Sequence, residues 1–353
     1  MDKKALRADI LLLLTAAIWG FGFVAQRSGM EHIGPFAFNG IRFILGSLFL
    51  LPYILIKRRS AVTRKIPLHR LFFPALAAGG ILFTAVIIQQ FGIIFTTAGN
   101  AGFITGFYVV LTPVIGNFLG RKTGIATWIG SILTLTGLYF ISVAGSRGSI
   151  NPGDILIFVS TFFWAAHILI IDRLMNTGIK NSKLSTEPQP SPKSVASTMR
   201  GSHLDPVELS SGQFAVCGIL SLLGAFLAEP HIGAIVERID PSLLGAGLFE
   251  WKPFPALVGG IASGVISFPV DALIPLLYGG LGSVGIAYTL QVVAQRDAPP
   301  AHATIIMCFE GSFAALGGVL LLSEKLGVWT AIGFFIMLTG MLVTQWEIII
   351  KNR

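Results

Sequence analysis

The sequence predicts an all-α integral membrane protein with ten transmembrane helices arranged as two inverted five-helix repeats. Three observations support this fold class. The composition is 53% hydrophobic and only 12% charged, far from the balance of a soluble protein. Ten continuous apolar stretches approach the roughly 20 residues that a helix needs to cross a bilayer. Landmarks of the first half also recur in the same order in the second half.

The ten predicted spans are continuous apolar runs about twice as long as a strand of a membrane β-barrel, so that architecture is excluded. The first five form one repeat, residues 8–144, and the last five form the other, residues 154–349. The spans lie at residues 8–26, 36–56, 71–95, 99–120, 124–144, 154–176, 207–228, 272–295, 299–322 and 327–349.

Several pairs of matching residues indicate the internal repeat. The offset between partners changes only from 145 to 203 residues along the chain, as loop insertions would cause. Because each copy has an odd number of spans, the second copy enters the membrane in the opposite direction, which is typical of inverted-repeat transporters. The pairs are Asp9-Ile10-Leu11 with Asp154-Ile155-Leu156, Trp19 with Trp164, Gly79-Gly80 with Gly279-Gly280, Gln89 with Gln291, and Thr136-Gly137 with Thr339-Gly340.

Basic residues predict the orientation of the chain. With the N-terminus in the cytoplasm, 19 of the 25 Lys and Arg residues fall on the cytoplasmic side, five fall outside, and Arg42 lies within a span. Cytoplasmic loops carry such an excess, so both termini are expected in the cytoplasm. The net charge of +8 follows from the same bias and does not indicate nucleic-acid binding. No cleavable signal peptide is evident.

Two connections are longer than the others. Residues 177–205 are rich in Ser, Pro, Lys and Thr, which predicts a disordered cytoplasmic linker; a regulatory or partner-binding segment is the alternative. Residues 229–271 form an external insert that combines acidic residues with an apolar, Gly-rich run. An interfacial or re-entrant stretch is one interpretation of this insert, although its glycines disfavour a helix.

Residue patterns for catalysis or metal binding are lacking. Cys217 and Cys308 both fall inside predicted spans, so they predict neither a disulfide framework nor a metal cluster and are expected to act as small apolar packing residues. The sequence has no P-loop for ATP hydrolysis and no nucleophile with an evident base. We therefore expect no enzymatic activity, no metal and no cofactor.

Helices one and six carry tryptophans at equivalent positions. Trp19 and Trp164 each lie about ten residues into a span, deeper than the interfacial belt where tryptophan is common. Two aromatic faces related by the repeat could hold an apolar or cationic solute from both sides. His167 follows Trp164 by one turn and faces the same way, as a cavity residue or as a hydrogen-bonded packing residue.

Arg42 of the second span corresponds to Gln213 when Pro35 is aligned with Pro206. It lies six residues inside the span, so its long side chain could extend back to the outer interface. Binding of an anion inside the membrane is the competing interpretation.

Polar residues on three helices predict a cavity. In hydrocarbon, polar side chains must find partners, so these faces point into the bundle whether they bind a solute or only each other. Spacings of i, i+3 and i+7 place each set of three on one helix face. The residues are Gln89 and Gln90 of helix three, Thr105, Tyr108 and Thr112 of helix four, and Tyr288, Gln291 and Gln295 of helix eight.

Glu310 lies near the middle of the ninth span. A charged carboxylate there costs at least ~2.5 kcal/mol, so the side chain is expected to face protein or water. Burial disfavours the charged form, which suits a group that exchanges a proton during transport. Glu310 is thus the candidate for proton coupling, and a fixed role in helix packing is the alternative.

Glycines mark close packing in helices five and ten. Gly130 and Gly137 are seven residues apart, as are Gly333 and Gly340, and the two pairs correspond at an offset of 203. One small face on each helix permits close backbone approach. These helices are expected to brace the repeats or to meet a partner protomer.

Three segments resemble the EamA-type branch of the drug/metabolite transporter superfamily, and the similarity covers nearly all of the chain except the two inserts. The resemblance implies ten helices in two inverted repeats, and secondary transport of amino acids, other small metabolites or drugs across bacterial inner membranes. One position departs from the family pattern, because Gly311 follows Glu310 where many relatives have proline. The segments are TAAIWGFGFVAQRSGMEHIGPFAFNGIRFILGSLFLLP, TTAGNAGFITGFYVVLTPVIG and YTLQVVAQRDAPPAHATIIMCFEGSFAALGGVLLLSEKLG.

We therefore expect a multi-pass protein of the bacterial inner membrane that moves a small organic solute by alternating access, as an exporter, with proton coupling as one option. The competing hypothesis is an uncoupled channel or facilitator. An intramembrane enzyme or receptor-like sensor is disfavoured, because no second domain is present. The expected partners are the solute and the lipid bilayer, without nucleic acid, and a homodimer is left open.

Overall fold

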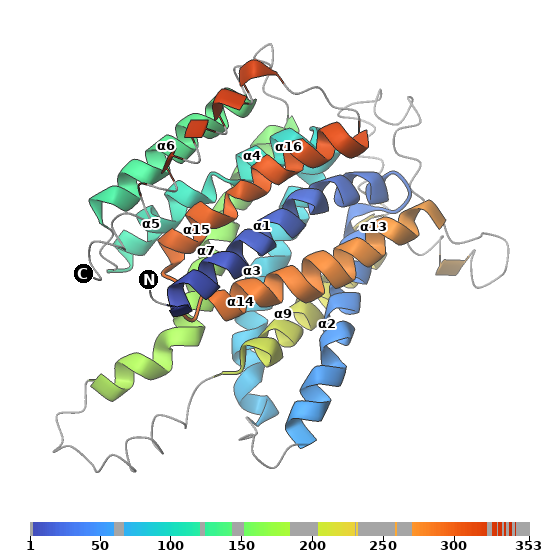
Figure 1. Ribbon diagram of the computed structural model, residues 1–353. Helices are drawn as coiled ribbons and strands as arrows, with labels where there is room; N and C mark the ends of the chain where they lie inside the picture. Colours follow the sequence, from blue (N-terminus) through green and yellow to red (C-terminus); the bar gives the residue numbers. More distant parts are fainter. Residues whose placement is uncertain are drawn as a thin grey trace.

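The structure is a computed structural model (Figure 1). It describes residues 3–59, 67–120, 124–142, 152–183, 204–229, 231 and 270–322, together with 258–259 and scattered positions between 327 and 343. The regular elements among these residues are helical, which confirms the predicted all-α class. They include α1 (Lys3–Met30), α2 (Pro35–Arg59), α3 (Leu68–Ile94), α4 (Ala98–Thr105), α5 (Tyr108–Phe118), α6 (Ile125–Ser142), α7 (Pro152–Lys183), α9 (Pro206–Leu227), η1 (Val270–Ala272), α13 (Leu273–Leu277), η2 (Tyr278–Tyr288), α14 (Thr289–Ala294), α15 (Pro300–Met307) and α16 (Phe309–Leu322).

Eight helical stretches among the described residues are long and apolar enough to cross a membrane, and they coincide with eight of the ten predicted spans. The fifth predicted span differs, because its apolar helical stretch, Ile125–Gly137, is shorter than the others. The tenth predicted span, residues 327–349, falls mostly outside the described residues. The predicted count of ten membrane helices is therefore not confirmed.

Helix α7 is longer than the sixth predicted span. It continues to Lys183, so the first residues of the predicted 177–205 linker are helical, and the disorder prediction is wrong for that part. The prediction failed there because polar residues that follow an established helix can extend it without burying apolar surface. Residues 184–203 and most of the insert 229–271 lie outside the described residues.

Two ion pairs join the last turn of α2 to the start of α9. Lys57 pairs with Asp205, and Arg58 donates to Glu208 from Nε at 2.7 Å and from Nη2 at 2.9 Å. Asp205 is also the N-cap of α9, where its carboxylate accepts from two backbone N–H groups. Basic groups at a helix C-terminus and acidic groups at an N-terminus are both favoured by the helix dipole. The two helices pack side by side from these pairs onward.

Two of the membrane-spanning stretches are interrupted near their middle. The break between α4 and α5 falls at Gly106 and Phe107, and the break between α15 and α16 falls at Cys308. Cys308, 202 residues after Gly106, donates a hydrogen bond from Sγ to the Gly106 carbonyl at 3.1 Å. The same carbonyl also accepts from the Val109 backbone N–H at 3.0 Å, so the thiol adds a second hydrogen bond to it and joins the two breaks directly.

Pro113 of α5 leaves one backbone carbonyl without a hydrogen-bond donor from its own helix. Proline has no N–H, so the Val109 carbonyl, four residues earlier, loses its intrahelical donor. Ser131 of the neighbouring α6 supplies one, since its Oγ donates to the Val109 carbonyl at 3.3 Å. The contact ties α6 to the discontinuous helix and shows why a proline is tolerated there.

The membrane-spanning stretch that follows α9, Val270–Ala294, contains a π-helix, η2, between α13 and α14. A π-helix uses i to i+5 hydrogen bonds and is rare except as single turns, often at functional sites. Here it runs for 11 residues and is rich in glycine. The wider turn changes which side chains share a face, and this matters for the cavity described below.

Glycine permits a close contact between α1 and α16 (Figure 1). A Cβ atom added at Gly20 would lie 2.3 Å from the Phe313 Cβ and 2.6 Å from the Glu310 carbonyl oxygen. Such distances are too short for any side chain. The glycine therefore brings Trp19, its neighbour in the sequence, up to the helix that carries Glu310.

The predicted small faces of helices five and ten meet at one described point. A Cβ atom added at Gly340 would lie 2.7 Å from the carbonyl oxygen of Gly130, in α6. Phe140 and Trp329 also stack, with ring centroids 5.7 Å apart. These contacts favour the bracing role within one chain over a role in meeting a partner, for the residues that are described.

Candidate functional site

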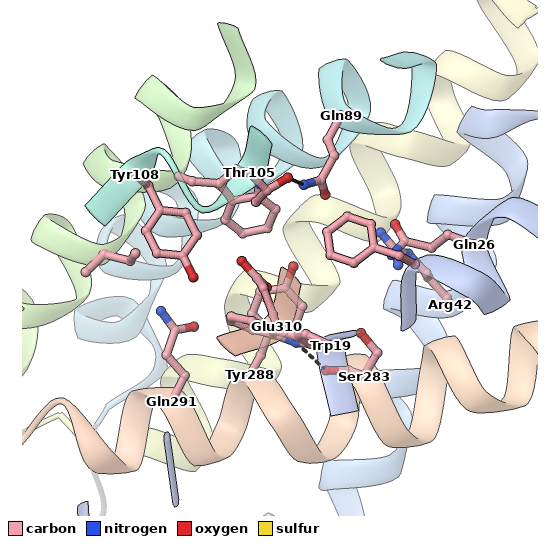
Figure 2. Close-up of a pocket in the computed structure, with 13 residues that line it drawn as sticks. Trp19, Gln26, Arg42, Gln89, Thr105, Tyr108, Ser283, Tyr288, Gln291 and Glu310 are labelled. Atoms are coloured by element: carbon pink, nitrogen blue, oxygen red, sulfur yellow. Dashed lines mark hydrogen bonds between the residues drawn. The ribbon is translucent and has the colours of Figure 1, made fainter. Parts of the chain in front are cut away.

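Thirteen residues from both halves of the chain line one cavity in the centre of the bundle (Figure 2). Its empty volume is about 430 Å³, including space open to solvent. The residues are Trp19, Phe23, Gln26, Arg42, Gln89, Thr105, Tyr108, Trp164, Ile168, Ser283, Tyr288, Gln291 and Glu310.

The cavity lies about midway along the helices that line it. Glu310 is about 15 Å from the start of α15 and about 18 Å from the end of α16, at about 1.5 Å per residue. Trp19 is about 24 Å from the start of α1 and about 16 Å from its end by the same measure. This depth is where transporters with discontinuous helices place their substrate sites.

Three aromatic side chains form one wall of the cavity. The Trp19 and Tyr288 rings have centroids 4.5 Å apart, and Trp164 stacks on Tyr288 at 6.0 Å. Trp19 is fixed further by a hydrogen bond of 3.3 Å from its Nε1 to the Ser283 carbonyl. The predicted pair of tryptophans is thus brought together, 6.3 Å between centroids, with a tyrosine completing the group.

The carboxyl of Glu310 faces the cavity from the first turn of α16. Its side chain is only 3% exposed, and its Oε1 has no hydrogen-bond partner among the described residues. The hydroxyl of Tyr108 has no hydrogen-bond partner at normal distance among the described residues, and it lies near enough to this carboxyl to interact with it electrostatically. Figure 2 shows the Tyr108 hydroxyl directed toward the space between Glu310 and Gln291.

Other polar residues divide into those that line the cavity and those that pair elsewhere. Gln89 donates to Thr105 Oγ1 at 2.7 Å, which holds α3 against α4 at the cavity wall. Gln295 does not line the cavity and instead donates to the backbone carbonyl of Ile168 at 3.2 Å. Thr112 and Gln90 are buried but do not line the cavity either. On each of the three helices, therefore, only some of the predicted polar residues line the cavity.

Arg42 lines the cavity from α2 and is 2% exposed. Its Nε donates to Asn39 Oδ1 at 2.8 Å, and its guanidinium carbon lies 5.7 Å from the Phe38 ring centroid and 5.1 Å from that of Phe43. The interpretation in which this side chain extends to the outer interface is wrong, because the guanidinium is enclosed by aromatic rings and helix α2 itself.

His167 was also predicted for the cavity and does not line it. The side chain is fully buried, and its Nε2 is 2.9 Å from Gln213 Oε1 of α9. Its ring meets Trp164 edge-on, with centroids 6.2 Å apart. His167 thus packs against the Trp164 ring without lining the cavity, in agreement with its interpretation as a hydrogen-bonded packing residue.

Four lining residues were not predicted from the sequence: Phe23, Gln26, Ile168 and Ser283. Gln26 follows Trp19 by seven residues, so helical periodicity could have found it. Ser283 precedes Tyr288 by five residues, a spacing that places two side chains on different faces of an α-helix. The π-helix η2 brings both side chains to the same cavity, and no spacing in the sequence predicts that turn.

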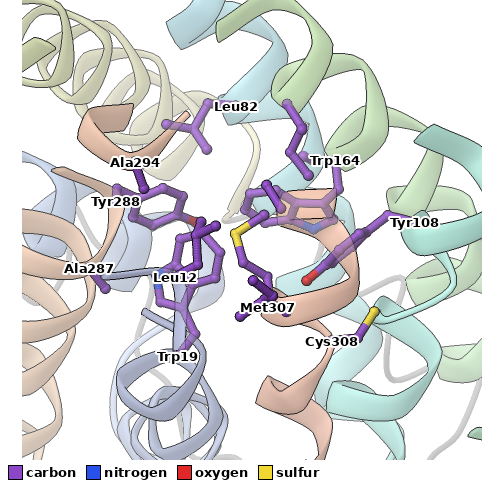
Figure 3. Close-up of a cluster of buried hydrophobic side chains, with 14 of the residues drawn as sticks. Leu12, Trp19, Leu82, Tyr108, Trp164, Ala287, Tyr288, Ala294, Met307 and Cys308 are labelled. Atoms are coloured by element: carbon purple, nitrogen blue, oxygen red, sulfur yellow. The ribbon is translucent and has the colours of Figure 1, made fainter. Parts of the chain in front are cut away.

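The apolar cluster that contains the lining residues Trp19, Tyr108, Trp164 and Tyr288 also contains side chains nearer the end of the bundle where α1 begins (Figure 3). Leu12, Leu82 and Met307 belong to it, each one or two turns from a lining residue of the same span. Beyond the cluster, His302 Nε2 lies 2.8 Å from Asp9 Oδ1, which joins α15 to α1. The pairs Lys57–Asp205 and Arg58–Glu208 close the same end.

Comparison with models of protein families shows which family the chain belongs to. The model of the EamA-like transporter family matches residues 6–143 and 194–346, which is most of the chain. The chain belongs to the EamA-like transporter family. The resemblance inferred from the sequence is confirmed, and with the membrane-spanning helices the match shows a multi-pass membrane transporter.

Individual relatives of this EamA-like protein are transporters by name. An uncharacterized transporter of Archaeoglobus fulgidus is 36% identical over 172 residues. The match covers 48% of this chain and 50% of that relative, so the chain spans about half of the relative's length. The uncharacterized inner membrane transporter YedA of Escherichia coli is 24% identical over 233 residues, 64% of this chain and 73% of YedA. The uncharacterized transporter YoaV of Bacillus subtilis is 20% identical and covers 93% of both chains.

A solved crystal structure shares the fold of this EamA-like protein, with a TM-score of 0.65 over 96% of this chain and 98% of the other, at 14% identity. Agreement over nearly both full lengths supports the arrangement of the helices around the cavity. Among the described residues, no group of three or more His, Cys, Asp or Glu side chains is placed to hold a metal ion.

Proposed function

We propose that the protein is a secondary transporter that exports a small organic solute, such as an amino acid, a related metabolite or a drug, by alternating access across the bacterial inner membrane. The observation that carries this proposal is the pair Tyr108 and Glu310. They are 202 residues apart, each follows a helix break by one or two residues, and both face one cavity at mid-depth. Their equivalence is expected of two inverted repeats that share a single site.

The helix breaks support a rocking motion about the cavity. In transporters of this kind one repeat moves against the other around a fixed site, and irregular backbone is tolerated only where it lines a cavity or is buried in protein. Here the breaks at Gly106 and Cys308 touch through a single hydrogen bond. Beside this bond α4 packs closely on α16, because a Cβ atom added at Gly102 would lie 2.7 Å from the Ala314 Cβ. This tight contact can act as the pivot about which the halves rotate.

The contacts at the end where α1 begins support one closed state. The apolar cluster around Leu12 and the two ion pairs between α2 and α9 have to separate before a solute can pass between the cavity and that side. With the orientation expected from basic residues, this end is the cytoplasmic one. The described conformation then corresponds to a carrier that is closed toward the cytoplasm.

Proton coupling by Glu310 is the finer part of the proposal. A proton can drive the cycle only if the two states bind it with different affinities. The carboxyl is buried beside the Tyr108 hydroxyl and has an oxygen without a partner among the described residues, so its surroundings are set by helices on both sides of the breaks. A rotation of the halves changes those surroundings and with them the affinity for the proton.

The first experiment identifies the solute. Metabolites inside and outside cells are compared with and without the protein. An exporter is expected to leave one solute accumulated inside cells that lack it. If the solute instead accumulates inside only when the protein is present, the direction is import, and export is refuted.

The second experiment tests the coupling with that solute in proteoliposomes. The wild type should accumulate it against its gradient when a pH difference is imposed. Glu310→Gln should retain exchange of labelled for unlabelled solute at equal pH but lose the accumulation. Asp271→Asn, which removes an exposed carboxylate far from the cavity, is the matched control and should behave as wild type.

Two outcomes contradict this part of the proposal. Unchanged accumulation by Glu310→Gln would show that the carboxyl is not the coupling group. Flux that is insensitive to the pH difference in the wild type would favour an uncoupled facilitator.

A further inference from the structure

The α2 side of the cavity holds a positive charge that the mechanism proposed above does not use. Arg42 is 2% exposed and lies in the wall beside Gln26, opposite the side where Tyr108 and Gln291 lie (Figure 2). A charged side chain in a membrane span is rare and usually marks a site for a substrate or an ion. The inference that follows rests on the proposed transport function, and it concerns the chemical class of the solute.

The guanidinium is oriented but not saturated. Among the hydrogen bonds of the described residues, it uses only Nε–H, which donates to Asn39 Oδ1 at 2.8 Å. The guanidinium has five N–H donors, so the four on its Nη atoms remain for another acceptor. The rings of Phe38 and Phe43 lie within 5.7 Å and 5.1 Å and restrict how the planar group can turn. The protein therefore holds the donors in place before any solute arrives.

Among the described residues, no carboxylate pairs with this positive charge. The groups of the described residues that interact electrostatically with Arg42 are Tyr288 and Cys217, a phenol and a thiol and not carboxylates. Glu310 lines the same cavity but is not among these groups. A buried cation without a counter-charge is costly, and a solute that supplies a negative charge removes that cost on binding.

A second polar atom at this side lacks a partner. Gln26 is 6% exposed and donates from Nε2 to the Gly22 carbonyl at 3.1 Å, while its Oε1 has no hydrogen bond among the described residues. The amide nitrogen carries two N–H groups, and the Gly22 carbonyl uses only one of them, so the other remains for an acceptor. The pair thus offers donors, and only donors are useful to an anionic group.

The remaining lining indicates the body of the solute. Trp19, Trp164 and Tyr288 form an aromatic wall next to the charged side. We propose that Arg42 is the recognition site for the carboxylate of a small aromatic or apolar organic acid, whose body packs on this wall. A carboxylate matches the planar guanidinium with two parallel N–H to O bonds, which makes the recognition specific as well as strong.

Binding to the purified full-length protein tests this proposal without knowledge of the natural solute. Phenylacetate, phenylacetamide and phenethylamine share one aromatic body and differ in charge, and each is titrated by isothermal calorimetry. Wild-type protein should bind phenylacetate more tightly than the amide and the amine. Arg42→Gln should weaken phenylacetate binding by about tenfold or more, the size expected for loss of a charged hydrogen bond, and leave the amide unchanged.

Two further variants separate recognition from folding. Gln213 occupies the equivalent position of the second repeat, so Arg42→Gln introduces a residue that this fold accepts in the other half. Arg42→Lys keeps the charge but loses the fork, and it should retain the preference for phenylacetate over the amide at reduced affinity. Arg296→Gln removes an exposed positive charge elsewhere and should leave all three titrations unchanged.

Three results would overturn the proposal. They are equal or tighter binding of the amide or the amine by wild-type protein, unchanged phenylacetate affinity in Arg42→Gln, and absence of phenylacetate binding by wild-type protein. None of these bears on transport itself, which is read independently by the comparison of cellular solutes. A carrier for neutral or cationic solutes would still export its cargo while failing this test.

Discussion

Substitution of Gly20 by alanine should separate α1 from α16 and disturb the cavity. The added Cβ would lie 2.3 Å from the Phe313 Cβ and 2.6 Å from the Glu310 carbonyl oxygen. Carbon atoms in contact need about 3.5 Å, so the two helices must move apart by about 1 Å. Neither obstacle can rotate away, because one is a Cβ atom and the other is backbone. Overpacking of this kind costs about 1–3 kcal/mol.

The consequence for transport should exceed the consequence for stability. The displaced carbonyl belongs to Glu310, and Trp19 is the neighbour of Gly20, so the carboxyl and the aromatic wall shift relative to each other. Misplacement of a functional group by about 1 Å can lower activity by about a hundredfold. We expect Gly20→Ala to melt a few degrees below wild type and to lose at least about nine-tenths of its exchange rate in proteoliposomes.

Gly80→Ala is the matched control for this experiment. Gly80 lies in the middle of α3, and a Cβ atom added there would meet nothing within 4 Å. Its substitution should be neutral or should stabilise the helix by up to about 1 kcal/mol, since alanine has the higher helix propensity. If Gly20→Ala matches Gly80→Ala in both melting temperature and exchange, the close contact between α1 and α16 does not position the site.

Three further predictions concern the helix breaks, the closed end and the topology. Ser131→Ala should lower the stability by about 1 kcal/mol in thermal unfolding, because the Val109 carbonyl then lacks a donor; a Ser131→Thr variant that is equally destabilised would contradict this reason. Arg58→Gln should favour opening of this end by about 1 kcal/mol, because the ion pair with Glu208 is lost. In a background without native cysteines, the substituted cysteine of Leu12→Cys should then react about fivefold faster with a thiol reagent. An unchanged rate would show that the bond to Glu208 does not hold this end closed. Reporter fusions should place both termini in the cytoplasm, and an external C-terminus would overturn the orientation.

The sequence was sufficient to predict the spans and much of the cavity, because both follow from local periodicity. Apolar length gave eight helices close to their positions in the structure. Trp19, Trp164 and Glu310 could be assigned to the interior since each is costly against lipid, and the structure brings all three to one cavity. What such residues do for a solute is not settled by their position and stays a proposal.

Errors arose where the outcome depends on which helix face meets which neighbour. His167 and Trp164 share a face of α7, but Gln213 of α9 lies where it can bind the imidazole, so only the tryptophan reaches the cavity. Arg42 has the length to reach the outer interface, yet Asn39 and two phenylalanines hold it inside. Tertiary contacts of this kind have no signature in the spacing of residues along one helix.

The helix interruption at Gly106 was equally hidden, for a different reason. Glycine is common in membrane helices and usually only permits close packing. Here the carbonyl of Gly106 accepts both from the Val109 backbone N–H and from the thiol of Cys308, which comes from a distant part of the chain. Neither residue reveals the break without the other beside it.

The π-helix η2 makes the two halves unequal, because its counterpart α3 is a regular α-helix over Leu68–Ile94. Were the halves identical, exchange of their conformations would produce two end states of the same energy, each occupied half of the time. A wide turn in one half alone removes that degeneracy. On the proposed mechanism the empty carrier then rests mainly in one state, and the solute must contribute the difference in energy through its preference for the other. Replacement of Gly282 by alanine within η2 is therefore a way to change the resting occupancy without touching a residue of the cavity.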